Sequence, residues 1–148
     1  MSIQKRIAAG AAFAALAFTS FAALADDHSY TEGAVVTVGY IRTVDGHFDD
    51  YMNWLDTTWK ALQEAGKKKG YIVSYQVVSA NPHGPDDPDL LLIVTYKNFA
   101  ALDGGLAKGD EIAKLVEGSV AAANASQQDR AKIRRVLGGD TYQVLELK

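Results

Sequence analysis

Apolar residues recur every three or four positions between Asp45 and Gly70. They are Phe48, Tyr51, Met52, Leu55, Trp59 and Leu62. On a helix of about 3.6 residues per turn these positions form one stripe, which has to be buried. Asp45 is a suitable N-cap, and three lysines precede Gly70, so the charges match both ends of the helix dipole. This pattern predicts one long amphipathic helix.

Four segments rich in β-branched and apolar residues predict strands. They are AVVTVGYIRT (34–43), YIVSYQVVSA (71–80), DLLLIVTYK (89–97) and TYQVLEL (141–147). The third is almost continuously apolar, which is typical of a buried, central strand. All three prolines fall within residues 81–89, which predicts a stiff, turn-rich connection between the second and third strands.

A second helical region precedes the last strand. Its apolar spacing begins at about Asp110 and resumes at Ser126, which has capping-box spacing to Asp129. We therefore expect two helical pieces with a break near Asn124. Gly138–Gly139 is expected to end the second piece.

The first 25 residues have the organisation of a secretory signal peptide. Lys5 and Arg6 precede an apolar run, and Ala23-Leu24-Ala25 has the small-x-small form of a cleavage site. We predict cleavage after Ala25 and a periplasmic or secreted bacterial protein, with a mobile arm over residues 26–33 and one domain over residues 34–148. No later stretch approaches the roughly 20 apolar residues that a membrane span needs.

The net charge of −3 argues against binding to nucleic acid or to an anionic membrane surface, because both require a basic patch. The chain has no cysteine, so its stability must come from a packed core and an oligomer interface.

The order strand, helix, strand, strand, helices, strand is the β-α-β-β-α-β order of the ferredoxin-like α+β fold. We expect one four-stranded antiparallel sheet with the helices on one face. The strands carry apolar residues on both faces, so an uncovered second face would be a large apolar patch. Two sheets packed face to face in a homodimer are the simplest cover.

This topology resembles the dimeric α+β-barrel superfamily, in particular an exported bacterial branch of it. The resemblance rests on element order and on the segments VGYIRT, FDDYMNWLDTTWK and DPDLLLIVTYKN. The superfamily includes antibiotic-biosynthesis-type and haem-degrading monooxygenases, and the resemblance implies a ligand held between sheet and helices, often without a metal. Haem-degrading members use a histidine on the second helix, whereas residues 107–138 contain none.

An apolar cleft with phenol groups is the usual composition of a small-molecule site. The residues that we expect to converge there are Tyr40, Tyr51, Trp59, Tyr75 and Tyr96; an ordinary tyrosine-bearing core is the alternative. Arg42 is expected to pair with an anionic ligand, or else with Asp45 or Asp49. Trp54 lies off the main stripe and suits a subunit contact or a pocket wall.

Three histidines are weak candidates for chemistry. His47, at the helix start, is a candidate general acid or base, and a solvent-facing histidine is the alternative. His28 is third from the predicted mature terminus, where it can chelate copper(II) or nickel(II), and His83 lies on the proline-rich loop beside aspartates. The alternatives are a disordered arm and a solvated turn, and we expect no cofactor.

These observations favour an exported homodimer that binds a small apolar or aromatic molecule without catalysis. One alternative is a cofactor-free monooxygenase or isomerase of the antibiotic-biosynthesis type. A second alternative is periplasmic copper or haem handling.

Overall fold

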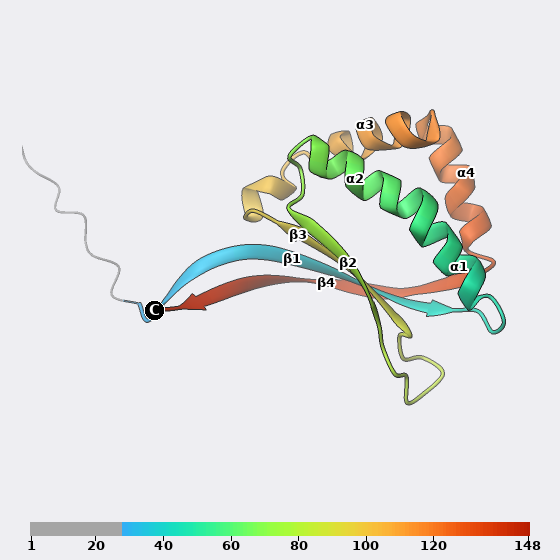
Figure 1. The fold of residues 1–148 in the computed structure, drawn as a ribbon, viewed down its shortest axis with the longest axis horizontal. Coiled ribbons are helices and arrows are strands. Elements are labelled where there is room, and N and C mark those ends of the chain that lie inside the picture. The colour runs from blue at the N-terminus through green and yellow to red at the C-terminus, as the bar shows by residue number, and fades with distance from the viewer. Residues whose placement is uncertain (1–27) are drawn as a thin grey trace, which may run out of the picture.

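The computed structural model describes residues 28–148, which form a four-stranded sheet with helices on one face (Figure 1). The elements are β1 (Tyr30–Thr43), α1 (Phe48–Trp54), the π-helical turn η1 (Leu55–Trp59), α2 (Lys60–Lys68), β2 (Ser74–Ser79), β3 (Leu90–Tyr96), the 3-10 turn η2 (Phe99–Leu102), α3 (Gly105–Glu117), α4 (Val120–Arg130) and β4 (Arg134–Leu147). The signal peptide predicted for residues 1–25 lies outside the described residues. Between residues 28 and 148, no helix has both the length and the apolar character that crossing a membrane requires.

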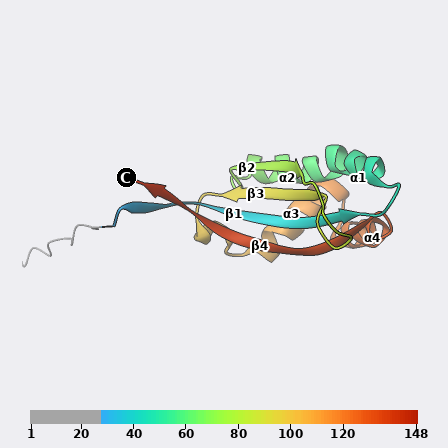
Figure 2. The same cartoon turned by 90° about the horizontal axis from the view of Figure 1, so that it is seen from below.

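The strands pair antiparallel in the order β2-β3-β1-β4. This topology confirms the predicted ferredoxin-like α+β fold. The apolar strand β3 occupies an inner position, as its composition predicts. Figure 2 shows that the helices form one layer behind the strands, so the sheet has one covered and one open face.

The core lies between the long helix and the inner strands. Tyr51, Leu55 and Trp59 recur every four residues across α1 and η1, and they pack against Ile41 of β1 and Leu90 of β3. All five side chains are buried. Burying a large apolar side chain contributes about 1.5–3 kcal/mol, so this cluster fixes the long helix on the sheet.

The ends of the long helix agree with the sequence only in part. The N-cap of α1 is His47, and Asp45 lies in a turn before it, so the predicted Asp45 cap is wrong. The other end agrees with the prediction, since Gly70 has a left-handed φ of 71°. The Tyr71 N–H donates to the Gly66 carbonyl at 3.0 Å, which is the bond expected after such a C-cap glycine.

The break between α3 and α4 falls at Gly118, which has a left-handed φ of 82°. Ser119 caps α4, because its Oγ accepts the Ala122 N–H at 3.0 Å. The predicted break near Asn124 and the predicted cap at Ser126 are therefore wrong. A glycine with positive φ ends α3 earlier than the apolar spacing indicates.

The prediction that Gly138–Gly139 ends a helix is also wrong. Both glycines lie inside β4, where Gly139 pairs with Gly39 of β1. A β-carbon at Gly139 would lie 2.8 Å from the Val38 carbonyl oxygen. Glycine is required here because the two backbones approach closely.

β1 and β4 extend beyond the other two strands as a two-stranded ribbon (Figures 1 and 2). We call the paired segments 30–32 and 145–147 the ribbon arm. β1 thus begins at Tyr30, earlier than the expected strand, and residues 30–33 of the predicted mobile arm belong to the sheet. Residues 26 and 27 of that predicted arm lie outside the described residues.

Candidate functional site

Three of the aromatic residues predicted to line a ligand site lie together between helix and sheet. Trp59 and Tyr75 meet edge to face with their ring centroids 5.3 Å apart, and Tyr51 belongs to the same core cluster. The Tyr75 hydroxyl donates to Glu64 Oε1 at 2.7 Å, and this bond raises the pKa of Tyr75 and lowers that of Glu64. These rings pack against one another as core side chains do, and their contact with a ligand stays a prediction.

Tyr40 and Arg42 do not join this group. Successive strand residues point to opposite faces, and Ile41, which lies between them, points toward the helices. The Tyr40 hydroxyl donates to Asp140 Oδ2 at 3.0 Å and lies 2.9 Å from the Tyr142 hydroxyl. These bonds, first the one with Tyr142, raise the pKa of Tyr40. The sheet separates Tyr40 and Arg42 from the other predicted site residues.

A cleft of about 380 Å³ lies on the helical side of the sheet, bounded by α2, α3, α4 and the end of β3. Its apolar wall includes Leu62, Ile72, Tyr96, Leu102, Ile112 and Ala113. Of the predicted ligand-binding residues, only Tyr96 lines it. Its volume falls within the range of small-molecule sites, which makes this cleft the candidate functional site.

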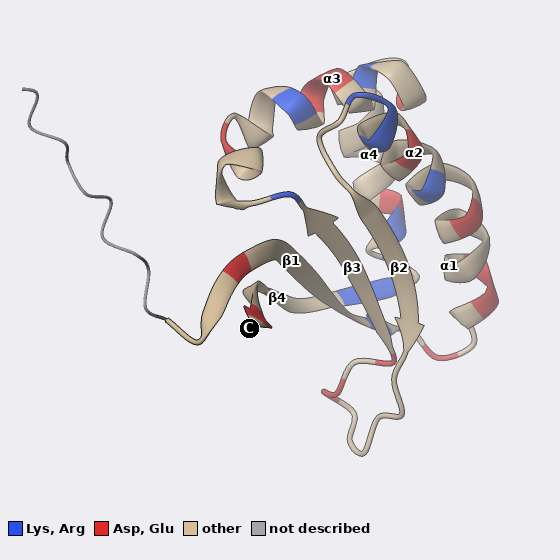
Figure 3. Cartoon of the chain, turned by 60° about the vertical axis from the view of Figure 1, so that its left-hand side comes forward, with Lys and Arg blue, Asp and Glu red and all other residues tan. Residues whose placement is uncertain are grey.

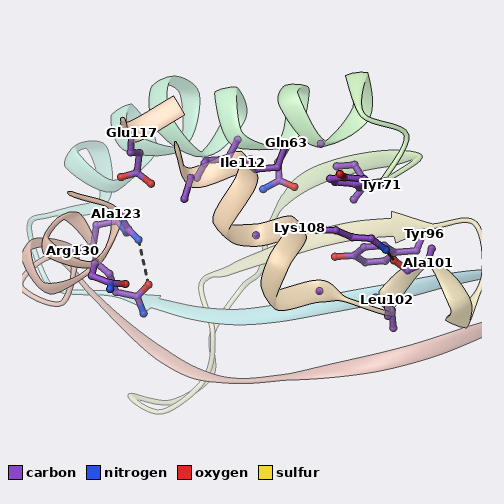
Figure 4. Close-up of a pocket in the computed structure, with 18 residues that line it drawn as sticks. Gln63, Tyr71, Tyr96, Ala101, Leu102, Lys108, Ile112, Glu117, Ala123 and Arg130 are labelled. Carbon is purple, nitrogen blue, oxygen red and sulfur yellow. Dashed lines mark hydrogen bonds between the residues drawn. The ribbon is translucent and has the colours of Figure 1, made fainter. Parts of the chain in front are cut away.

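At one end of the cleft, hydrogen bonds join the segment after α2 to α3. The Tyr71 hydroxyl donates to Glu111 Oε2 at 2.5 Å, and Lys69 Nζ donates to Glu111 Oε1 at 2.7 Å. These bonds, with the one from Lys69 the stronger influence, lower the pKa of Glu111. Lys108 Nζ donates to the Ala101 carbonyl at 2.8 Å and lies 5.4 Å from the centroid of the Tyr71 ring. Figure 4 shows Tyr71, Tyr96 and Lys108 together at this end.

The opposite end is formed by Arg130, the last residue of α4, with Glu117 nearby (Figure 4). Arg130 is only 9% exposed, and its guanidinium carbon lies 4.1 Å from the centroid of the Trp54 ring. Trp54 in turn stacks on Tyr51 with ring centroids 5.5 Å apart. Burial, followed by the charge of Arg134, lowers the pKa of Arg130. Trp54 therefore packs inside the subunit, behind the cleft.

Apart from Tyr96, the residues at the two ends of the cleft were not predicted from the sequence. Arg130 was not predicted because α4 is Ala-rich and because it begins at Val120, whereas the capping-box spacing indicates a start at Ser126. One signal was present in the sequence: Ala123, Gln127 and Arg130 follow one another at spacings of four and three, which places an arginine on the same helix face as a small residue. Lys108 carried no comparable signal.

The histidines form no recognisable centre. His47 Nδ1 lies 2.7 Å from Asp50 Oδ2 on the helix surface, and the backbone N–H of His83 donates to Asp87 at 2.9 Å. The His28 ring stacks on Tyr30 with centroids 5.5 Å apart. Among residues 28–148, no group of three or more His, Cys, Asp or Glu side chains is placed to hold a metal ion.

The open face of the sheet is largely apolar. Strand pairing places Val38 and Tyr40 of β1 beside Ile93 and Leu91 of β3 on this face. Val144 and Tyr142 of β4, which are 39% and 48% exposed, continue it. Figure 3 shows charged residues mainly on helices and loops, while β1, β2 and β3 are almost free of them.

Two solved structures share this architecture. HapK from Hahella chejuensis is 14% identical with a TM-score of 0.50, and the match covers 73% of this chain and 90% of HapK. Protein SO0527 from Shewanella oneidensis is also 14% identical with a TM-score of 0.50, and the match covers 79% of this chain and 96% of that protein. No protein-family model and no curated protein matches the sequence. The comparisons thus identify the chain by its fold alone, as a protein similar to HapK and SO0527 in its α+β architecture.

Proposed function

We propose that this chain is an exported, homodimeric domain of the dimeric α+β-barrel type that binds a small apolar or aromatic molecule. The observation that carries the proposal is the cleft of about 380 Å³ between α2, α3 and α4. Aliphatic side chains line it, Tyr71, Tyr96 and Lys108 lie at one end, and Glu117 and Arg130 lie at the other (Figure 4). A site of this composition binds by burying apolar surface and orients its ligand by a few polar contacts.

A neutral fluorescent probe tests the binding function directly. N-phenyl-1-naphthylamine is apolar, aromatic and uncharged, and its emission rises when it leaves water. We expect saturable binding by the mature protein, with one probe molecule per chain. Absence of saturable binding would refute the cleft as a site for ligands of this class.

A cavity-filling variant locates the probe. Ala113 lines the cleft, so Ala113→Phe should fill it and abolish probe binding. Ala107, on the exposed side of α3, offers the matched control Ala107→Phe, which should bind the probe as the parent protein does. Equal binding by both variants would place the probe elsewhere.

The homodimer is supported by the open face of the sheet. An isolated subunit would leave an apolar surface with few charges in water, and a second copy presents an identical, complementary surface. The ribbon arm also exposes Leu145 and Leu147, which are 52% and 85% exposed and, by strand alternation, point to the opposite face from Val144. We expect the two open faces to pack together and the arms to lie against the partner.

Sedimentation measures this association. The parent protein should sediment as a dimer, and Val144→Asp should give monomers because it places a charge on the open face. Leu106 is 83% exposed on the helical side, so Leu106→Asp should leave the dimer intact. A monomeric parent protein would refute the proposed dimer.

Export is supported by the leader pattern of residues 1–25. Expression of the full chain in a bacterium, followed by intact-mass measurement of the periplasmic fraction, tests it. We expect a mature chain that begins at Asp26. A full-length cytoplasmic product would refute export.

A further inference from the structure

Arg130 carries a positive charge that is nine-tenths buried at one end of the cleft. A guanidinium has five N–H donors. Arg130 donates one to Ser126 Oγ at 2.7 Å, and a longer contact of 3.5 Å reaches Gln127 Oε1. Its Nε is buried with no hydrogen-bond partner. The hydrogen-bonding capacity of Arg130 is thus only partly used by the protein.

No ion pair within residues 28–148 involves Arg130. A second arginine, Arg134, is half-buried near the stacked rings of Tyr51 and Trp54. Its guanidinium carbon lies 5.5 Å from the Tyr51 ring centroid. Its Nε is likewise buried without a partner. Buried charges are ordinarily paired, because desolvation costs several kcal/mol per ion. The charge of Glu117, at the same end of the cleft, acts on Arg130 without forming an ion pair, so the unused N–H donors of the two guanidiniums still favour the arrival of an anion.

Arg130 lies at one end of the cleft, and apolar residues lie between the two ends. Ile112 and Ala113 line the wall between the two ends, and Figure 4 shows Arg130 and Glu117 at one end, far from Tyr71 and Lys108 at the other. Lys108 donates to a carbonyl, lies against a ring and is less buried than Arg130, so water can also solvate its charge. The geometry suits an elongated molecule with an apolar body and one anionic end.

We infer that the ligand of this cleft is an amphipathic organic anion whose carboxylate binds the Arg130 guanidinium while its aliphatic or aromatic body lies along Ile112 and Ala113. This inference rests on the proposed binding function and adds the chemical class of the ligand. The planar guanidinium suits a carboxylate because it can offer two parallel N–H donors. The face of the Trp54 ring contacts the guanidinium as well.

Matched competitors for N-phenyl-1-naphthylamine test the charge preference. Naphthalene-1-acetate and naphthalene-1-acetamide have nearly the same shape, but only the acetate is an anion. We expect the acetate to displace the probe at a concentration lower by about tenfold or more, as charge-assisted hydrogen bonds allow. If the probe binds but the two competitors are equal, the anion inference is overturned while the binding function stands. If the probe does not bind, the binding function itself fails.

Variants at the two ends locate the anion. Arg130→Met should remove the preference for acetate, and Arg130→Lys should retain part of it, because charge remains without the planar fork. Lys108→Met tests the opposite end of the cleft, and the exposed Arg135→Met, which lies outside the cleft, is the control and should keep the full preference. Loss of preference in Lys108→Met instead of Arg130→Met would overturn the placement. Circular dichroism establishes that each variant is folded before its binding is compared.

Two further measurements do not depend on loss of Arg130. Glu117 lines the cleft near Arg130, so Glu117→Gln should strengthen acetate binding by removing a like charge. The chain has two tryptophans, so Trp59→Phe leaves the emission of Trp54 alone. In that variant octanoate should change the emission, and octanamide should have little effect at the same concentration. Weaker binding of naphthalene-1-acetate by Glu117→Gln would overturn the inference. Equal changes in Trp54 emission with octanoate and octanamide would overturn it too.

Discussion

The Asp89 carboxylate binds the backbone N–H of Thr43 through both oxygens, at 3.0 and 3.1 Å, and also accepts the Thr43 hydroxyl. The Asp89 N–H donates to the Ile41 carbonyl at 2.9 Å. Thr43 ends β1 and is only 8% exposed, so one half-buried side chain joins the end of β1 to the start of β3. The proline-rich loop before β3 thus has a structural role at its last residue.

Asp89→Ala should lower the free energy of unfolding by about 1.5–3 kcal/mol, because hydrogen bonds to a charged group are lost and a buried donor is left without a partner. Urea denaturation measures the change. Asp86 lies on the same loop and is exposed, so Asp86→Ala should change the free energy of unfolding by no more than about 0.5 kcal/mol. Equal effects of the two substitutions would contradict the role assigned to Asp89.

Tyr51→Phe should leave stability unchanged or increase it slightly. The ring is fully buried, but the hydroxyl has no hydrogen-bond partner, so its removal eliminates a desolvated polar group at no loss of packing. Tyr51→Ala should cost about 3–5 kcal/mol because it leaves a cavity. Tyr75→Phe is the matched control, since it removes a hydroxyl bonded to Glu64 and should lower the melting temperature. A large loss in Tyr51→Phe would reveal a partner for its hydroxyl.

Acid should weaken the contact between α2 and α3. The pKa of Glu111 is held below its ordinary value of 4.5 by hydrogen bonds from Lys69 and Tyr71. Its contribution to stability is therefore fully present above about pH 4.5 and is lost as the pH falls through the lower folded-state value. In Glu111→Gln, the free energy of unfolding should depend less on pH in this window. An unchanged acid dependence would show that the bonds seen here add little in solution.

Gly139→Ala should destabilise the pairing of β1 with β4. The new β-carbon would lie 2.8 Å from the Val38 carbonyl oxygen, so the strands would have to separate locally at a cost of about 1–3 kcal/mol. Gly109→Ala provides the contrast, because nothing lies within 4 Å of the new carbon in α3. Alanine there should stabilise the helix by about 0.5–1 kcal/mol. Chemical denaturation of both variants checks the opposite signs.

The ferredoxin-like order could be read from local patterns, because each element carries its own signal. The stripe of Tyr51, Leu55 and Trp59 predicts the long helix, and the apolar run of β3 predicts its central place in the sheet. These signals follow from the 3.6 and 2.0 residue periods of helix and strand and require no knowledge of partners. The short, Ala-rich α4 lacked such a signal, and its boundaries were misplaced.

The candidate site was decided by tertiary structure. Alternation along β1 separates Tyr40 from Tyr51, although both are tyrosines of the same fold and both were expected in one cleft. Arg130 reaches Trp54 across 76 positions of sequence only because the last residue of α4 lies against the last residue of α1, and that contact buries the charge. Periodicity specifies which face of an element is buried, whereas the residues that meet between elements depend on packing among distant segments. The sequence by itself therefore determined the layers of this protein, and the three-dimensional packing determined where its cleft lies and which charges face it.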